Sequence, residues 1–226
     1  MRTIIALFVW LFVSMPALAT GISALSEEDA ANGLKQALTQ GAGVAVNKLG
    51  VANGFLKNPE VKIQLPGALQ QVGGVMRSLG MGKYAEGLIA AMNHTAETAT
   101  AEAGSLLADA VKKMPAEDAK KILAGGDKAA TQYFRETTSD ELSQKFLPIV
   151  KKATDQVGLL RKYNEFAGKG AKLGLVAEKD ANIESYVTQK TLEGIYLIMA
   201  EEEHLIRNDP MGQENELLRK VFGSLK

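Results

Sequence analysis

Apolar residues recur at intervals of three and four along almost the whole chain after residue 26, and they rarely alternate with polar ones. This spacing places apolar side chains on one face of an α-helix, whereas a half-buried strand needs strict alternation. The one alternating stretch, residues 61–65, is a single five-residue segment, and one such strand does not make a sheet. The pattern therefore predicts an all-α fold, an irregular multi-helix bundle.

The first nineteen residues differ from the rest and read as a secretory signal peptide. Arg2 is their only charged residue, residues 4–13 are uninterruptedly apolar, and Pro16 precedes small residues that end at Ala19. This order is typical of a leader cleaved after Ala19. The alternative is an uncleaved membrane anchor, but a spanning helix needs roughly 20 apolar residues. We therefore expect residues 20–226 to form a single all-helical domain exported to the periplasm.

Composition narrows the functional classes. The chain has no Cys, 46% hydrophobic residues, and 26 basic against 26 acidic side chains. These proportions exclude a disordered chain and a disulfide-stapled miniprotein, and the missing Cys excludes a bacterial lipoprotein anchor. A neutral chain without interleaved aromatic residues does not favour nucleic acid as a partner. After signal cleavage no apolar stretch is long enough to span a membrane.

Local signals predict where the helices begin and end. Ser26 is a candidate N-cap, and three glycines (Gly33, Gly41 and Gly43) suggest that the first helix bends or ends early. Residues 50–66 read as a loop, and further helices are expected over 66–79, 83–114 and 115–123. The next long helix should start at the capping box of residues 138–141 and be kinked or divided at Pro148. Glycines at 168, 170 and 174 indicate a flexible connection, Asp180 could cap the following helix, and the last helix should restart at residues 209–210.

The helix that begins near Ile183 should be the centre of the bundle, because its apolar residues cover nearly its whole circumference. Charge adds a second expectation about packing. Residues 145–172 carry seven basic and two acidic side chains, whereas residues 173–216 carry ten acidic and three basic ones. We expect these two segments to lie side by side and compensate one another. The alternative is a basic face for nucleic acid or anionic lipid.

The run Glu201, Glu202, Glu203 and His204 is the main candidate for chemistry. Its Glu-x-x-His spacing puts Glu201 and His204 on adjacent turns of one helix face. Di-iron bundles need two such pairs and two further glutamates, so the metal signal is incomplete, and we expect no cofactor. Because Glu201 falls on an apolar face, its carboxylate needs a cation or hydrogen-bond donors. We predict that Glu201 or Glu202 pairs with a cation of another helix, with Arg161 or Arg135 as candidates.

Other motifs add little. The chain has no Walker loop and no His-Glu-x-x-His or Gly-x-Ser-x-Gly motif. The glycosylation sequon at Asn93 lies inside a predicted helix and is interpreted as coincidence. The tyrosines and phenylalanines fall at helical spacings, which favours the core over a ligand cage.

Four blocks of residues resemble a known family. They are Gly54-Phe55-Leu56 with Pro59 and Leu65-Pro66; Ala130 to Arg135 with Thr138-Ser139; Ala200 to Glu203 with Ile206-Arg207 and Asp209-Pro210; and Lys220 to Gly223. Together they are similar to the bacterial family catalogued as domain of unknown function 4197, over nearly the whole mature chain. The resemblance implies an exported, all-helical envelope protein, and it brings no catalytic residues to carry over.

The resemblance also suggests a buried polar or partner-binding site, because two of its polar blocks lie in apolar surroundings. We expect these residues to meet in space: Gln132, Tyr133, Arg135, Glu201, Glu202, Glu203, His204 and Arg207. The leading hypothesis is a non-enzymatic protein that binds an envelope partner. The alternatives are a carrier of a lipid or other apolar ligand between helices, and a metal-dependent enzyme that uses residues 201–204. An apolar cavity above about 300 Å³ would favour the carrier, and three converging carboxylates or imidazoles would favour the enzyme.

Overall fold

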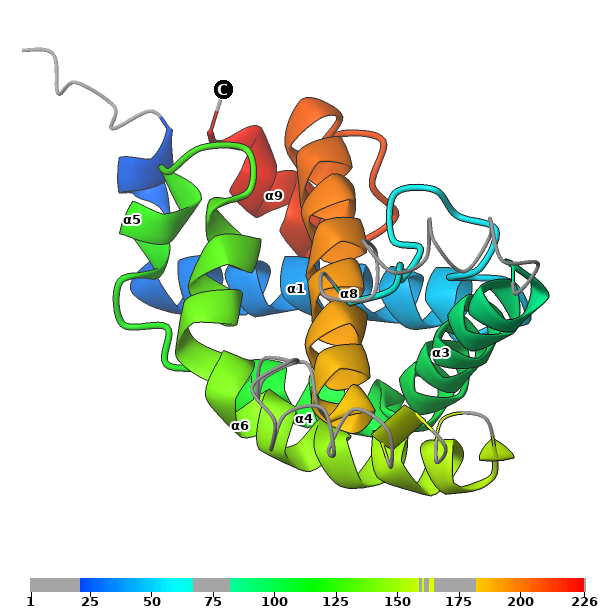
Figure 1. Ribbon diagram of the computed structural model, residues 1–226. Coiled ribbons are helices and arrows are strands. Elements are labelled where there is room, and N and C mark those ends of the chain that lie inside the picture. Colours follow the sequence, from blue (N-terminus) through cyan, green and yellow to red (C-terminus); the bar gives the residue numbers. More distant parts are fainter. Residues whose placement is uncertain (1–20, 67–81, 159, 161–162, 165–181, 226) are drawn as a thin grey trace, which may run out of the picture.

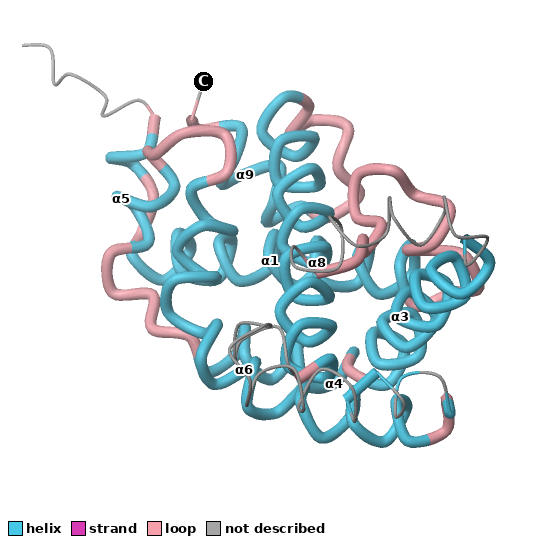
Figure 2. Tube along the Cα trace, in the orientation of Figure 1, coloured by secondary structure: helices cyan, strands magenta, loops and turns pink. Residues whose placement is uncertain are grey.

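The computed structural model describes residues 21–66, 82–158, 160, 163–164 and 182–225. Within these ranges the chain forms seven α-helices, one turn of 3-10 helix and no strand (Figure 2). After the 3-10 turn Ile22–Ala24 the helices are α1 (Glu27–Leu49), α3 (Gly82–Glu102), α4 (Gly104–Lys113), α5 (Ala119–Leu123), α6 (Ala129–Asp155), α8 (Ile183–Asn208) and α9 (Glu216–Gly223). The all-α prediction is confirmed.

Helix α8 is the centre of the packing, as its pattern predicts. More than half of its 26 residues are buried, and it contacts α1, α3, α6 and α9. Figure 1 shows it standing upright across the horizontal α1. The apolar surface does not continue around its last turn, because Leu205 is 54% exposed.

Three helices begin at side-chain caps. Ser26 accepts a hydrogen bond from the Asp29 amide at the start of α1, as expected. Asn182 caps α8 through the Ser185 amide, and the candidate cap Asp180 lies outside the described residues. The last helix does not restart at residues 209–210: α9 begins after Asn215, whose side chain accepts from the amides of residues 217 and 218. Both asparagines supply the local oxygen that an N-cap requires.

The glycines of α1 do not end it early, and two of the three serve packing. The helix runs unbroken for 23 residues. A Cβ at Gly33 would lie 2.6–2.8 Å from three side-chain atoms of Val221, and one at Gly41 would lie 3.3 Å from the Met199 Cα. Glycine at these two positions therefore lets α9 and α8 approach the α1 backbone closely. Contacts with two neighbours outweigh the helix-propensity cost of about 1 kcal/mol per glycine.

The helix expected over 83–114 is interrupted at Ala103, between α3 and α4. The Ala103 amide bonds to the Thr100 carbonyl, which is a tightened i to i−3 turn. The residues just before it are small, and the end of α1 approaches them closely: a Cβ on Gly50 would lie 3.0 Å from the Ala101 backbone. The interruption lets the chain turn beside the end of α1.

The segment between α1 and residue 66 is irregular, as predicted, and it is held by two buried side chains of α3. Asn93 accepts from the Ile63 amide at 2.9 Å and donates to the Ile63 carbonyl at 2.8 Å. Glu97 accepts from the amides of Phe55 and Leu56 at 3.1 and 3.0 Å. Because Asn93 is fully buried, the sequon cannot present it for glycosylation.

Helix α6 contradicts the predicted start at residues 138–141, because it begins nine residues earlier at Ala129. Inside the helix Thr138 donates to the Phe134 carbonyl at 2.6 Å, so its hydroxyl does not cap anything. Pro148 does not divide the helix either. Its neighbours Phe146 and Val150 are fully buried, and their packing compensates for the cost of an internal proline, about 3 kcal/mol.

The expected charge compensation is tested by only three of its seven basic residues, because the other four lie outside the described part of the chain. Helices α6 and α8 do pack together, but their contact includes the edge-to-face pair of Phe134 and Tyr196, with ring centroids 6.1 Å apart. Lys145 pairs with Glu141 of its own helix, and Lys152 lies 3.3 Å from Glu102 of α3. The part of α6 around Lys152 therefore lies beside the end of α3.

Several predictions fall outside the described residues: the signal peptide, most of the helix over 66–79, the glycine-rich connection and Arg161. No helix in the described ranges is both long enough and apolar enough to cross a bilayer.

Candidate functional site: a groove between α6 and α8

Helix α6 has no cap of its own, and Glu203 of α8 supplies one. The N-cap residue Lys128 makes no side-chain cap bond. The carboxylate of Glu203, only 2% exposed, instead accepts from the Ala130 amide at 2.9 Å and from the Thr131 amide and hydroxyl at 2.8 Å. A negative charge at a helix N-terminus is also favoured by the helix dipole. Glu203 thus fixes the start of α6 against α8.

Arg207 compensates the charge of Glu203 from the next turn of α8. Its Nε donates to Glu203 Oε1 at 2.9 Å, and Nη2 makes an ion-pair contact with the same oxygen at 2.8 Å, without the alignment of a hydrogen bond. Nη1 donates to the Leu123 carbonyl at the end of α5, and the guanidinium lies over the Phe222 ring of α9. The Glu203–Arg207 pair therefore joins four helices and has a structural role.

The remaining residues of the acidic run face other directions. The glutamate that is buried is Glu203, not the Glu201 expected from the sequence; Glu201 is only partly buried. Glu202 accepts from Gln40 of α1 at 2.9 Å, and His204 lies 3.2 Å from Asp127. Neither Glu201 nor Glu202 forms the predicted ion pair with Arg135, and the other candidate, Arg161, lies outside the described residues.

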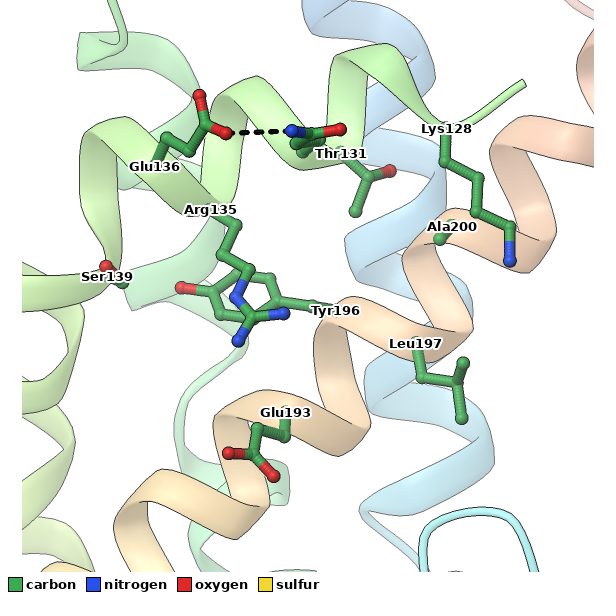
Figure 3. Close-up of a pocket in the computed structure, with 10 residues that line it drawn as sticks. Lys128, Thr131, Arg135, Glu136, Ser139, Glu193, Tyr196, Leu197 and Ala200 are labelled. Carbon is green, nitrogen blue, oxygen red and sulfur yellow. Dashed lines mark hydrogen bonds between the residues drawn. The ribbon is translucent and has the colours of Figure 1, made fainter. Parts of the chain in front are cut away.

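An open groove of about 570 Å³ lies between the first half of α6 and the middle of α8. Figure 3 shows its side chains: Arg135 and Lys128 project from α6 toward α8, and Tyr196, Leu197 and Ala200 come from α8. Thr131 lines the groove and also binds Glu203. The structural pair and the groove thus share one turn of α6.

Arg135 lies over Tyr196, with the guanidinium carbon 5.8 Å from the ring centroid (Figure 3). The ring is fixed from another side by the edge-to-face contact with Phe134. Burial raises the pKa of Tyr196 to about 12, against smaller lowering effects of the Thr138 hydroxyl and the Arg135 charge. Its hydroxyl has no well-aligned hydrogen-bond partner in the described part of the chain. Tyr196 is therefore a neutral aromatic platform within cation–π distance of the guanidinium.

The acidic residues of the groove already have partners. Glu193 lies 2.6 Å from the Lys190 Nζ and accepts from Gln189. Glu136 accepts a hydrogen bond from the side-chain Nε2 of Gln132 at 2.9 Å, the dashed contact in Figure 3. Lys128 and Arg135, in contrast, are exposed and form no ion pair with any residue that the structure describes. Lys128 and Arg135 therefore face the groove without an ion-pair partner among the described residues, beside Glu136, whose carboxylate is bound only by the neutral Gln132 side chain.

A second hollow of about 620 Å³ continues the groove along α8. It lies between residues 60–64 and α8 and shares Arg135, Glu193 and Leu197 with the first. Together they follow α8 from Tyr186 to Ala200, a distance of about 21 Å at 1.5 Å per residue. The combined surface is an elongated groove with Arg135 at its middle.

The residues expected to form one polar site are thus divided. Gln132 and Arg135 line the groove, Glu203 and Arg207 form the structural pair, and Tyr133 lies on another side of α6, beside Asp118 and Ile122. Sequence reasoning missed Lys128, Glu193 and the platform role of Tyr196. The sequence signal that could have found the two cations is their spacing, because Lys128 and Arg135 are seven residues apart, which is two helical turns. The predicted start of the helix at residues 138–141 placed both residues outside it, so the spacing could not be interpreted.

The described residues contain no group of three or more histidine, aspartate or glutamate side chains arranged to hold a metal ion. The groove exceeds 300 Å³, but it is open, and four of its ten lining residues are charged.

These features define an all-α protein with an open, polar groove between two packed helices. The chain belongs to the family described as "Protein of unknown function (DUF4197)", whose model matches residues 24–223. The resemblance seen in the sequence is confirmed. No curated protein and no solved structure matches the chain.

Proposed function

We propose that this chain is an exported, non-enzymatic protein that binds an envelope partner in the groove between α6 and α8. The observation that carries the proposal is Arg135, which is exposed, in cation–π contact with Tyr196 and free of any ion pair within the described residues. Elsewhere in the structure the buried charges, such as Glu203 and Glu97, are used to hold segments of the chain together. A cation held in place without an internal partner is what a recognition site requires.

Export is supported by the leader pattern of the first nineteen residues. The test is expression of the full chain in a bacterium, followed by fractionation and N-terminal sequencing. The expected product lies in the periplasm and begins at Thr20. A product that keeps residues 1–19 and stays with the membrane would instead support the uncleaved anchor.

Binding in the groove is tested by photo-crosslinking in cells. A photoreactive residue is placed at Leu197, which lines the groove, or at Leu205, which is on the same helix, more exposed and outside the groove. We expect a discrete adduct from position 197 that is absent or much weaker at position 205. Equal labelling at both positions, or none at 197, would refute a partner in the groove.

The two alternatives have weaker support. A lipid carrier would need an apolar cavity, whereas charged residues such as Lys128 and Glu193 line the groove. For a metal enzyme, Glu203 is already bound by Arg207 and two backbone amides. Native mass spectrometry of protein from its own periplasm would reveal a retained lipid or metal and so revive either alternative.

A further inference from the structure

Lys128 and Arg135, which form no ion pair within the described residues, are arranged in register. Lys128 and Arg135 are seven residues apart on or beside α6, which places them on the same face at about 10 Å, or two helical turns. Both line the groove, and Figure 3 shows both side chains projecting toward α8. The Glu203 cap holds the first turn of α6, so the spacing is set by the fold rather than by a flexible loop.

Arg135 is prepared to bind a flat, doubly accepting anion. Its guanidinium carbon lies 5.8 Å from the centroid of the Tyr196 ring, within the range of a cation–π contact, and the guanidinium forms no ion pair within the described residues, so its donors stay available. A guanidinium in this state binds a carboxylate through two parallel hydrogen bonds. Lysine at position 128 adds a second, less directional charge.

The shape of the groove selects an extended chain. Its length of about 21 Å accommodates about six residues of extended polypeptide at 3.3 Å each. Acidic side chains two to four residues apart on such a chain are about 7 to 13 Å apart, which spans the separation of the two cations. Leu197 and Ala200 of α8 provide the less polar surface across from α6.

The same geometry disfavours the other anionic partners. Arg135 lies in a groove between α6 and α8, and such a concave site accommodates an extended chain more readily than a flat membrane surface. A nucleic acid backbone would bring many more charges than two cations can compensate.

We infer that the groove binds an extended, acidic segment of a partner protein, with one carboxylate on Arg135 and a second, two to four residues away, on Lys128. This inference rests on the proposed function, because it names the chemistry of the partner at the same groove.

The test is fluorescence anisotropy with labelled nine-residue peptides of glycine, serine and alanine. The peptides carry two glutamates spaced by two, three or four residues, or glutamines in their place. We expect binding only with glutamates, and weaker binding as salt is raised. Arg135→Gln should reduce affinity about tenfold, the effect of losing one charge-assisted bidentate contact. Arg135→Lys should restore only part of it, and Lys128→Gln should have a smaller effect.

Lys151→Gln is the matched control, because Lys151 is an exposed lysine of α6 outside the groove. It should leave binding within about twofold of the wild type, since a distant exposed charge contributes little. Helix content by circular dichroism establishes that each variant is folded. Peptide binding that Arg135→Gln leaves unchanged, or that Lys151→Gln weakens equally, overturns the inference.

The experiment also separates the inference from the proposed function. If crosslinking at Leu197 succeeds but no glutamate peptide binds, the groove has a partner of another chemistry and only the inference fails. Binding of anionic phospholipid vesicles that Arg135→Gln abolishes, without peptide binding, would likewise replace the peptide with a lipid. If neither crosslinking nor peptide binding occurs, both fail.

Discussion

Replacing Glu203 by glutamine tests whether one carboxylate of α8 holds the start of α6. The substitution keeps size and shape but removes the charge and converts one acceptor into a donor. Glu203 accepts from two backbone amides and one hydroxyl and pairs with Arg207. In the variant an amide NH₂ would face either the Thr131 donors or the guanidinium, and Arg207, whose side chain is only 9% exposed, would lose its counter-charge.

The expected loss of stability is large. Removing one partner of a buried ion pair costs about 3–5 kcal/mol, because the remaining charge stays buried without compensation. The orphaned amides of α6 are part of that cost rather than an addition to it, since these contacts act as one network. For a chain of this size such a loss lowers the melting temperature by about 6–20 °C.

The assay is urea unfolding followed by circular dichroism, with Glu202→Gln as the matched control. Glu202 is the adjacent residue, is partly exposed, and makes a single side-chain bond to Gln40, so its substitution should cost less than about 1 kcal/mol. If the two variants are equally stable, the capping of α6 by Glu203 is refuted. A double variant that also carries Arg207→Met should recover part of the loss, because no unpaired charge then stays buried.

Three further predictions concern other parts of the fold. Gly33→Ala should destabilise the protein by about 1–3 kcal/mol, because the new methyl group overpacks against Val221. Gly43→Ala places its new Cβ where nothing lies within 4 Å and should stabilise the protein by about 1 kcal/mol. Urea unfolding measures these changes of opposite sign in the free energy of unfolding. Burial raises the pKa of Tyr196 to about 12 in the folded chain, above the unfolded value near 10. Its contribution to folding stability is therefore intact below pH 10, and about 2–3 kcal/mol of stability is lost as the pH rises from 10 to 12, because the unfolded chain ionises first. Tyr196→Phe should flatten the stability profile over that range, and an unchanged slope would contradict the burial argument. Asn93→Ala removes three hydrogen bonds and should speed amide hydrogen exchange in residues 60–64. Hydrogen–deuterium exchange followed by mass spectrometry would detect the change.

Much of the architecture is predictable from patterns within a few residues. The spacing of apolar residues predicts helices throughout, and the nearly continuous apolar surface of residues 183–206 predicts the central helix. Ser26 marks the start of α1 because its cap lies three residues away. In each case the interaction lies within one or two helical turns, so the local sequence contains all the information required.

The candidate site was only half predictable. Gln132 and Arg135 are in the groove, but Tyr196 read as an ordinary core residue. Its ring is indeed buried, yet one face supports Arg135, and the platform exists only because α6 and α8 pack together. Helical periodicity distinguishes buried from exposed residues but does not show which neighbouring helix covers a given face.

The amino-acid order alone therefore determines that this chain is helical, where its strongest local caps act, and which segment is apolar enough to lie at the centre. The start of α6, the glutamate that becomes buried and the use of glycine in α1 depend on the folded chain. Glu203 and the Ala130 amide that it caps are 73 residues apart, and Gly33 is explained by Val221 near the other end of the chain. Such contacts form only when distant helices pack, so no pattern within a single helix can reveal them.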